Sequence, residues 1–118
     1  MSLTTKLQTI AQVLGAVTIP TGETTSQSLK VGHYEYFGND TPYCVWAESQ
    51  EQSSSEGDNY KNEQAIQGTI DFYTKAEFDP FIDAIQDALK LNRISFYLNS
   101  VQYEHETGLI HYEWVFGI

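Results

Sequence analysis

The chain has 118 residues, with 16 Asp or Glu against 6 Lys or Arg, so its formal net charge is −10. The length predicts a single domain over residues 1–118, and 41% hydrophobic residues are enough to form a packed core. A negative charge repels nucleic-acid phosphate, no apolar run approaches the roughly 20 residues of a membrane span, and one cysteine excludes an intrachain disulfide. We therefore expect no specific nucleic-acid binding, no membrane partner and a cytosolic setting.

The first predicted element is a helix over residues 3–14. Its apolar residues recur at the spacing of one helical face, at Leu3, Leu7, Ile10 and Leu14. Ser2, Thr4 or Thr5 can cap its start, and Gly15 is a plausible stop.

A long loop is predicted over residues 16–42, which hold two prolines and a polar run. Short extended pieces are expected at residues 17–19 and 34–37. Loops this long in a small domain are often functional or disordered. Three aromatic residues in it are hard to bury in a small core, so we treat them as interface candidates, with local packing as the alternative: Tyr34, Tyr36 and Phe37.

A hairpin with a long tip is predicted next. Residues 43–49 form its first strand, and residues 63–75 form its second, because apolar residues alternate there at every second position. The polar residues 50–62 between them are expected to be a mobile hairpin loop. Further interface candidates lie in this loop at Glu51, Glu56, Asp58 and Tyr60.

The rest of the chain predicts a second helix and a second hairpin. Asp79 can cap a helix that begins with Pro80 and ends near Asn92. Strands over residues 94–103 and 109–118 follow, joined by a turn at residues 106–108. The expected fold is α+β, a four-stranded antiparallel sheet with two helices on one face, in the order α-β-β-α-β-β, with the long loop after the first helix.

Motifs for chemistry are scarce. His105 and His111 flank the last turn near several glutamates, but their spacing matches no metal-ligand motif, and exposed surface histidines are the simpler interpretation. Cys44, in a predicted strand, is interpreted as a small buried hydrophobe. No glycine-rich phosphate loop is present. We therefore expect no enzyme activity, no catalytic residue, no cofactor and no bound metal.

The amino-acid sequences of several segments resemble those of the tail-completion proteins of long-tailed bacteriophages. These proteins are also known as tail terminators, minor capsid proteins or head–tail joining proteins. The matching segments are T-P-Y-C-V-W at residues 41–46, Q-G-T-I-D-F-Y-T-K at 67–75, D-P-F-I-D-A-I-Q-D-A-L at 79–89 and Y-E-W-V-F at 112–116. The resemblance covers roughly residues 40–118 and rests on sequence pattern rather than on an invariant motif. The family has no catalytic residues to carry over.

The resemblance implies a structural protein of a phage or prophage virion, assembled in the cytoplasm of the bacterial host. Family members look like ring-forming subunits, often hexameric, that complete the tail and join it to the head connector. The implied partners are further copies of the chain, tail-tube proteins and connector proteins. The alternative is a non-phage protein–protein adaptor or regulator with the same layout of helices and strands, since fold does not imply function.

Overall fold

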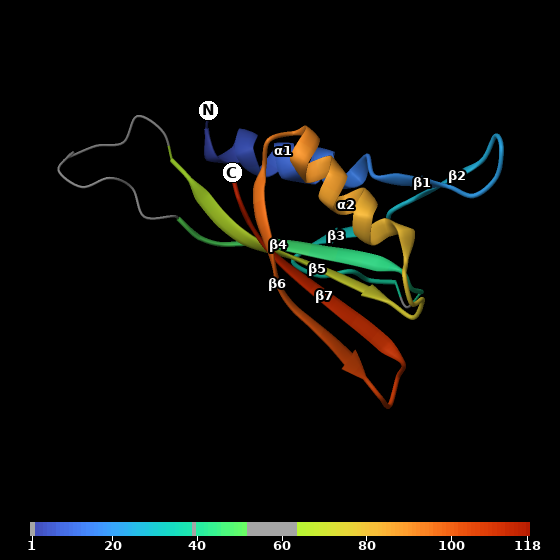
Figure 1. The fold of residues 1–118 in the computed structure, drawn as a ribbon. Coiled ribbons are helices and arrows are strands. Elements are labelled where there is room, and N and C mark those ends of the chain that lie inside the picture. Colours follow the sequence, from blue (N-terminus) through green and yellow to red (C-terminus); the bar gives the residue numbers. More distant parts are fainter. Residues whose placement is uncertain (1, 39, 52–63) are drawn as a thin grey trace.

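The structure is a computed structural model that describes residues 2–38, 40–51 and 64–118. Both helices lie on the same face of the main sheet (Figure 1), and one hydrophobic cluster joins them to it. The predicted α+β class and the placement of both helices are thus confirmed. The elements are α1 (Leu3–Gly15), β1 (Thr18–Pro20), β2 (Ser26–Ser28), β3 (Val31–His33), β4 (Tyr43–Glu51), β5 (Ile66–Thr74), α2 (Pro80–Leu91), β6 (Ser95–Glu104) and β7 (Leu109–Gly117).

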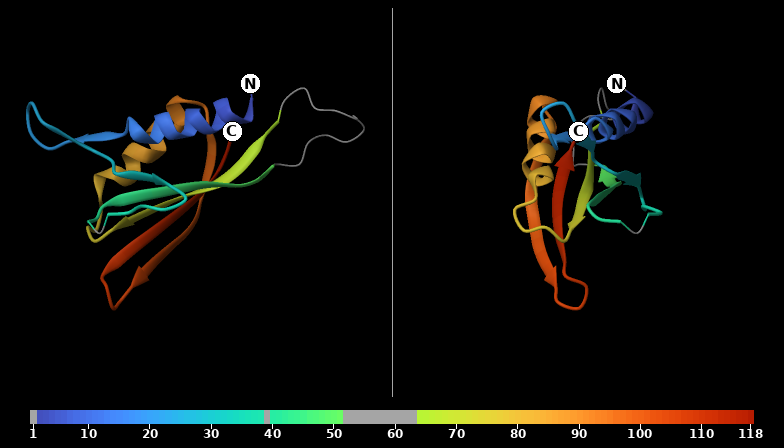
Figure 2. Two further views of the ribbon diagram at one scale, coloured as in Figure 1. Left: turned by 180° about the vertical axis from the view of Figure 1, so that it is seen from behind. Right: turned by 90° about the vertical axis from the view of Figure 1, so that its right-hand side faces the viewer.

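The main sheet has five strands, in the order β3-β4-β5-β7-β6. The pairs β4–β5, β5–β7 and β7–β6 are antiparallel, and the two predicted hairpins, β4–β5 and β6–β7, are confirmed. The prediction of a purely antiparallel four-stranded sheet in the order α-β-β-α-β-β is wrong, because β3 adds a fifth strand parallel to β4. Figure 2 shows the β6–β7 hairpin extending beyond the part of the sheet that the helices cover.

The predicted long loop over residues 16–42 contains three short strands. β1 and β2 pair with each other outside the main sheet. β3 joins the edge of the main sheet and ends directly before residues 34–37, where the expected extended piece is not a strand. The loop is anchored by Val17 and Leu29, whose side chains are buried and whose backbones are joined by a 2.9 Å hydrogen bond. A strand of three residues is too short to be identified in the sequence by the alternation of apolar and polar residues.

Strand β5 runs through the centre of the sheet, and its side chains alternate between the core and the opposite face. The core positions are all buried, at Ile66, Gly68, Ile70, Phe72 and Thr74. Gly68 pairs with Phe116 of β7, and an added Cβ at Gly68 would lie 2.6 Å from the Phe116 ring. A glycine is required there because the added Cβ would also lie 2.3 Å from the Ala47 carbonyl oxygen, so the backbone of β4 and the aromatic ring both exclude it.

Helix α1 combines a capped start with a buried lysine. The Ser2 hydroxyl accepts a hydrogen bond from the Thr5 backbone N–H at 3.1 Å, which identifies Ser2 as the cap. Lys6 is only 4% exposed, and its ammonium donates to the backbone carbonyl of Gln64 and lies 3.4 Å from that of Ile118. The lysine thereby joins α1 to residues at the ends of β5 and β7.

Helix α2 begins at Pro80, as predicted, and is joined to β5 by a buried polar link. One carboxylate oxygen of Asp79 accepts from the Phe81 backbone N–H at 2.9 Å, and the other accepts from the Thr74 hydroxyl at 2.6 Å. Asp79 and Thr74 are 6% and 1% exposed. Their hydrogen bonds therefore replace the water that both groups lose on folding.

Replacing Asp79 by alanine should destabilise the protein by about 2 kcal/mol, because the helix loses its cap and the buried Thr74 hydroxyl loses its acceptor. Urea unfolding followed by circular dichroism measures the change. Asp87→Ala is the matched control, since Asp87 is an exposed acid within the same helix. Equal losses in the two variants would contradict the role of the link.

Helix α2 ends in a Schellman motif with arginine at the position that glycine usually takes. The Ile94 N–H donates to the Leu89 carbonyl at 2.9 Å, and the Arg93 N–H donates to the Lys90 carbonyl at 3.1 Å. Arg93 has φ +58°, in the left-handed region that costs energy for any residue with a Cβ.

Arg93→Gly should therefore stabilise the protein by about 0.5–1 kcal/mol, measured as a higher urea midpoint at an unchanged slope. Arg93→Ala removes the same side chain but keeps the Cβ, and it should bring no comparable gain. A gain from alanine as large as that from glycine would show that the arginine side chain, rather than its backbone conformation, is responsible.

Candidate interaction surface

Strand β6 is an edge strand of the sheet, and most of its apolar side chains are exposed. Leu98, Val101 and Tyr103 are 47%, 50% and 56% exposed. Neighbouring strands cover only one side of an edge strand, so its outer backbone groups are open to pairing with another chain. We call Leu98, Val101 and Tyr103 the β6 row.

A β-bulge aligns the β6 row on one face. Leu98 pairs with Trp114 and Val101 with Tyr112, with the register shifted between Leu98 and Ser100. Trp114 belongs to the core, so the row lies on the helix-bearing face, where the hairpin extends beyond the helices. The β6 row was not predicted, because apolar residues alternate at Ile94, Phe96 and Leu98 and the alternation then changes phase at Asn99. That change of phase is the sequence signal of the bulge.

Tyr34, one of the predicted interface residues, belongs to a stacked cluster at the other edge of the sheet. The His33 ring lies between the rings of Tyr34 and Trp46, with both centroid distances at 3.8 Å. His33 Nε2 lies 2.7 Å from a Glu48 carboxylate oxygen, and the Tyr34 hydroxyl donates to the other oxygen. Tyr34 is nevertheless 61% exposed, so one face of its ring remains available.

Tyr34 and Glu48 shift each other's pKa values. The hydrogen bond to Glu48 raises the pKa of Tyr34 above its usual value. Burial alone would raise the pKa of Glu48, but the hydrogen bonds from Tyr34 and His33 outweigh it and hold that pKa below its usual value. The ionised carboxylate is therefore the form that holds the cluster together.

Tyr36 and Phe37 differ in their surroundings. The Tyr36 ring is half-buried and stacks on Tyr43 at 4.8 Å, and Tyr43 in turn stacks on Tyr73 of β5 at 4.9 Å. Local packing thus accounts for Tyr36. Phe37 is 89% exposed, which makes it the most exposed large apolar side chain among the described residues.

The other predicted interface residues lie at or beyond the end of β4. Glu51 is the last residue of that strand, and its carboxylate accepts a hydrogen bond from the Gln64 side chain at 3.0 Å. Three of them lie outside the described residues, namely Glu56, Asp58 and Tyr60. The predicted hairpin loop over residues 50–62 also lies outside the described residues from position 52 onward.

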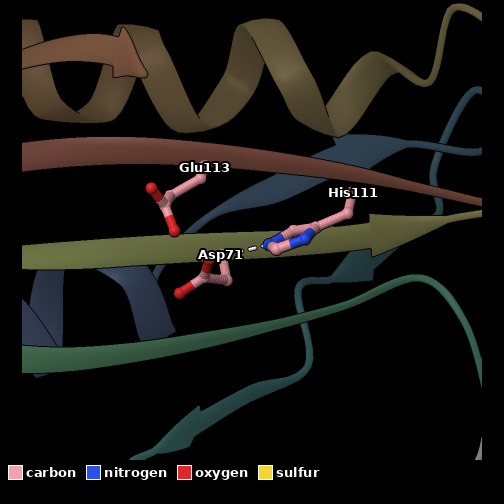
Figure 3. A group of neighbouring side chains, drawn as sticks. All are labelled: Asp71, His111 and Glu113. Atoms are coloured by element: carbon pink, nitrogen blue, oxygen red, sulfur yellow. Dashed lines mark hydrogen bonds and ion pairs between the residues drawn. The ribbon is translucent and has the colours of Figure 1, made fainter. Parts of the chain in front are cut away.

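His111 lies with Asp71 and Glu113 rather than with His105. His111 and Glu113 come from β7 and Asp71 from the neighbouring β5, and His111 Nε2 lies 2.7 Å from an Asp71 carboxylate oxygen (Figure 3). Burial raises the pKa of Asp71, and the hydrogen bond from His111 only partly opposes this. His105 instead packs edge-on against Tyr103 at a centroid distance of 4.8 Å.

Cys44 lies on β4 with no exposed surface. Burial raises its pKa well above the usual range, which stabilises the thiol over the nucleophilic thiolate. The interpretation of Cys44 as a buried hydrophobe is confirmed.

No family model and no curated protein matches the chain. Among the described residues, no helix has both the length and the apolar character needed to cross a membrane.

Glu48→Gln should lower stability near pH 7 by about 1 kcal/mol or less, because the cluster is partly open to solvent. The pKa of Glu48 is lowered by folding, so its contribution is present above the unfolded value of about 4.5 and is lost as the pH falls through the folded value. The difference between wild type and variant should therefore shrink on acidification.

Urea unfolding at about pH 7 and about pH 3.5 measures this difference. Glu77→Gln changes an exposed glutamate outside the cluster and serves as the control. A deficit of Glu48→Gln that is equal at both pH values would contradict the role of the ionised carboxylate.

Proposed function

We propose that the chain is a structural subunit that assembles head to tail with copies of itself into a closed ring. The observation that carries this proposal is the position of the exposed apolar side chains at both edges of one sheet. The β6 row lies at one edge, and Tyr34 and Phe37 follow β3, the strand at the other edge.

Opposite edges suit a ring because ring contacts join two different surfaces of neighbouring subunits. In the proposed contact, the β6 row of one copy packs against Phe37 and the exposed ring face of Tyr34 in the next copy. Each subunit then uses both surfaces, and the closed ring covers the β6 row, Tyr34 and Phe37 of every copy.

The sequence of β6 also favours pairing. Natural edge strands are commonly protected by lysine, proline or a short length. β6 has ten residues, SFYLNSVQYE, without lysine, arginine or proline. Its bulge twists the strand, but the apolar side chains still lie on one face.

The net charge of −10 opposes assembly, because neighbouring copies repel each other. Salt at about 0.15 M reduces the screening length to about 8 Å, so association is expected to strengthen with ionic strength. Association that strengthens with salt would indicate an apolar contact between acidic copies, whereas a contact held by ion pairs would weaken with salt.

We propose further that this ring belongs to a phage or prophage virion, where it completes the tail and joins the tail tube to the head connector. Four segments support this assignment through their resemblance to tail-completion proteins, at residues 41–46, 67–75, 79–89 and 112–116. Two helices on one face of a sheet and exposed side chains at both sheet edges are compatible with a ring subunit.

The first experiment is the mass in solution, measured by light scattering over a wide range of concentration and salt, with electron microscopy of any large species. Rings of one size are expected, either for the chain alone or after addition of tail-tube and connector proteins. A chain that stays monomeric under all these conditions would contradict the proposal, and a stable dimer with a shared sheet would favour the adaptor.

Blocking either edge should abolish rings. Val101→Lys places a charge in the β6 row and Phe37→Lys places one at the other edge, so each variant alone should remain monomeric. Leu91→Lys is the control, since Leu91 is 82% exposed but lies at the end of α2.

Mixing the two blocked variants tests the head-to-tail geometry. Each variant keeps one functional surface, so an equimolar mixture should form 1:1 dimers that do not grow further. A mixture that remains monomeric, or a Leu91→Lys variant that loses its rings as well, would contradict the proposed contact.

A further inference from the structure

The cluster of Asp71, His111 and Glu113 lies on the sheet face opposite the helices, outside the proposed ring contacts. Asp71 and Glu113 are direct cross-strand partners, and His111 is two residues before Glu113 on the same face of β7. One ligand atom from each of the three residues lies within 4.8 Å of the others. Figure 3 shows the His111 ring and the Glu113 carboxylate directed toward Asp71.

Neighbouring side chains hold these groups in place. The His111 ring stacks on Tyr73 with a centroid distance of 4.4 Å and an interplanar angle of 16°. The side-chain amide of Asn99, the residue at the bulge of β6, donates to Glu113 Oε1 at 2.7 Å. Partners of this kind orient metal ligands in proteins, and here they act on side chains carried by paired strands.

The chemical types of the donors select a class of cation. Two carboxylates and a neutral imidazole supply two negative charges, which match a divalent ion. An imidazole nitrogen favours first-row transition metals and Zn²⁺, whereas Mg²⁺ and Ca²⁺ prefer oxygen ligands alone. Ligand atoms around tetrahedral Zn²⁺ lie roughly 3.4 Å apart, so modest side-chain rotations would bring the three groups into range.

We propose that Asp71, His111 and Glu113 form a binding site for one divalent first-row cation, with Zn²⁺ as the best match. The ion would bridge β5 and β7. His111 and Tyr73 also line a cavity of about 240 Å³, which provides space beside the site for a water molecule as the remaining ligand. The ion takes the place of the proton between His111 Nε2 and Asp71, and the neutral imidazole then carries its one proton on Nδ1.

The test is a titration of the untagged, EDTA-treated chain with Zn²⁺ by isothermal calorimetry, with metal analysis after dialysis. One ion per chain is expected for the wild type. His111→Asn and the double variant Asp71→Asn with Glu113→Gln should lose stoichiometric binding. Asn99→Ala should weaken affinity by about tenfold, because it removes only the orienting hydrogen bond.

His105→Asn is the matched control, since it removes an exposed histidine of the same hairpin that lies outside the cluster. It should bind Zn²⁺ like the wild type. Circular dichroism and thermal unfolding in EDTA establish that each variant folds, and Asn99→Ala reports on the site even if a ligand variant does not fold.

Absence of one-to-one binding in the wild type would overturn the proposal, as would binding that His105→Asn removes and His111→Asn keeps. This inference does not rest on ring formation. A monomeric chain that binds Zn²⁺ at this cluster would support the site while contradicting the proposed function.

Discussion

Burial of one face of β5 beneath both helices is the constraint on which the rest of the structure depends. Every second side chain of this strand lies in the core, and Phe72 packs edge-on against Phe81 of α2 at 6.2 Å. Because side chains alternate along a strand, the same burial directs Asp71 and Tyr73 to the opposite face. The cross-strand partners on β4 and β7 follow this alternation, so the core and the polar cluster are fixed by a single register.

The helices cover only part of the sheet, and this limited cover separates the core from the proposed contact surface. Trp114 is fully buried, and its indole N–H donates to Gln86 of α2 at 2.9 Å. Its neighbour on β6, Leu98, lies on the same face but is half-exposed. The same apolar pattern thus forms a core beneath the helices and an open edge beyond them, which is why pattern alone did not distinguish the two.

Strong local signals made much of the fold predictable from the sequence. Asp79-Pro80 marks the start of α2, the alternation along residues 66–74 identifies β5, and Gly108, with φ +73°, marks the last turn. β3 was missed because its partner lies parallel and its three residues show no periodicity. The cluster around His111 was misplaced because Asp71 is 40 residues away in the sequence, and only the pairing of β5 with β7 brings the two together.

Cys44 provides a natural probe of how this fold opens. It is the only cysteine in the chain, and it lies in the core with no exposed surface. A thiol reagent can reach Cys44 only after β4 separates from the core residues packed against it. The labelling rate therefore reports the population of open molecules. The same thiol can follow the opening of a single copy and of the proposed assembly, in which a neighbouring copy would cover the edge of β3 next to β4. Comparing the two rates would measure how strongly assembly protects that edge of the sheet.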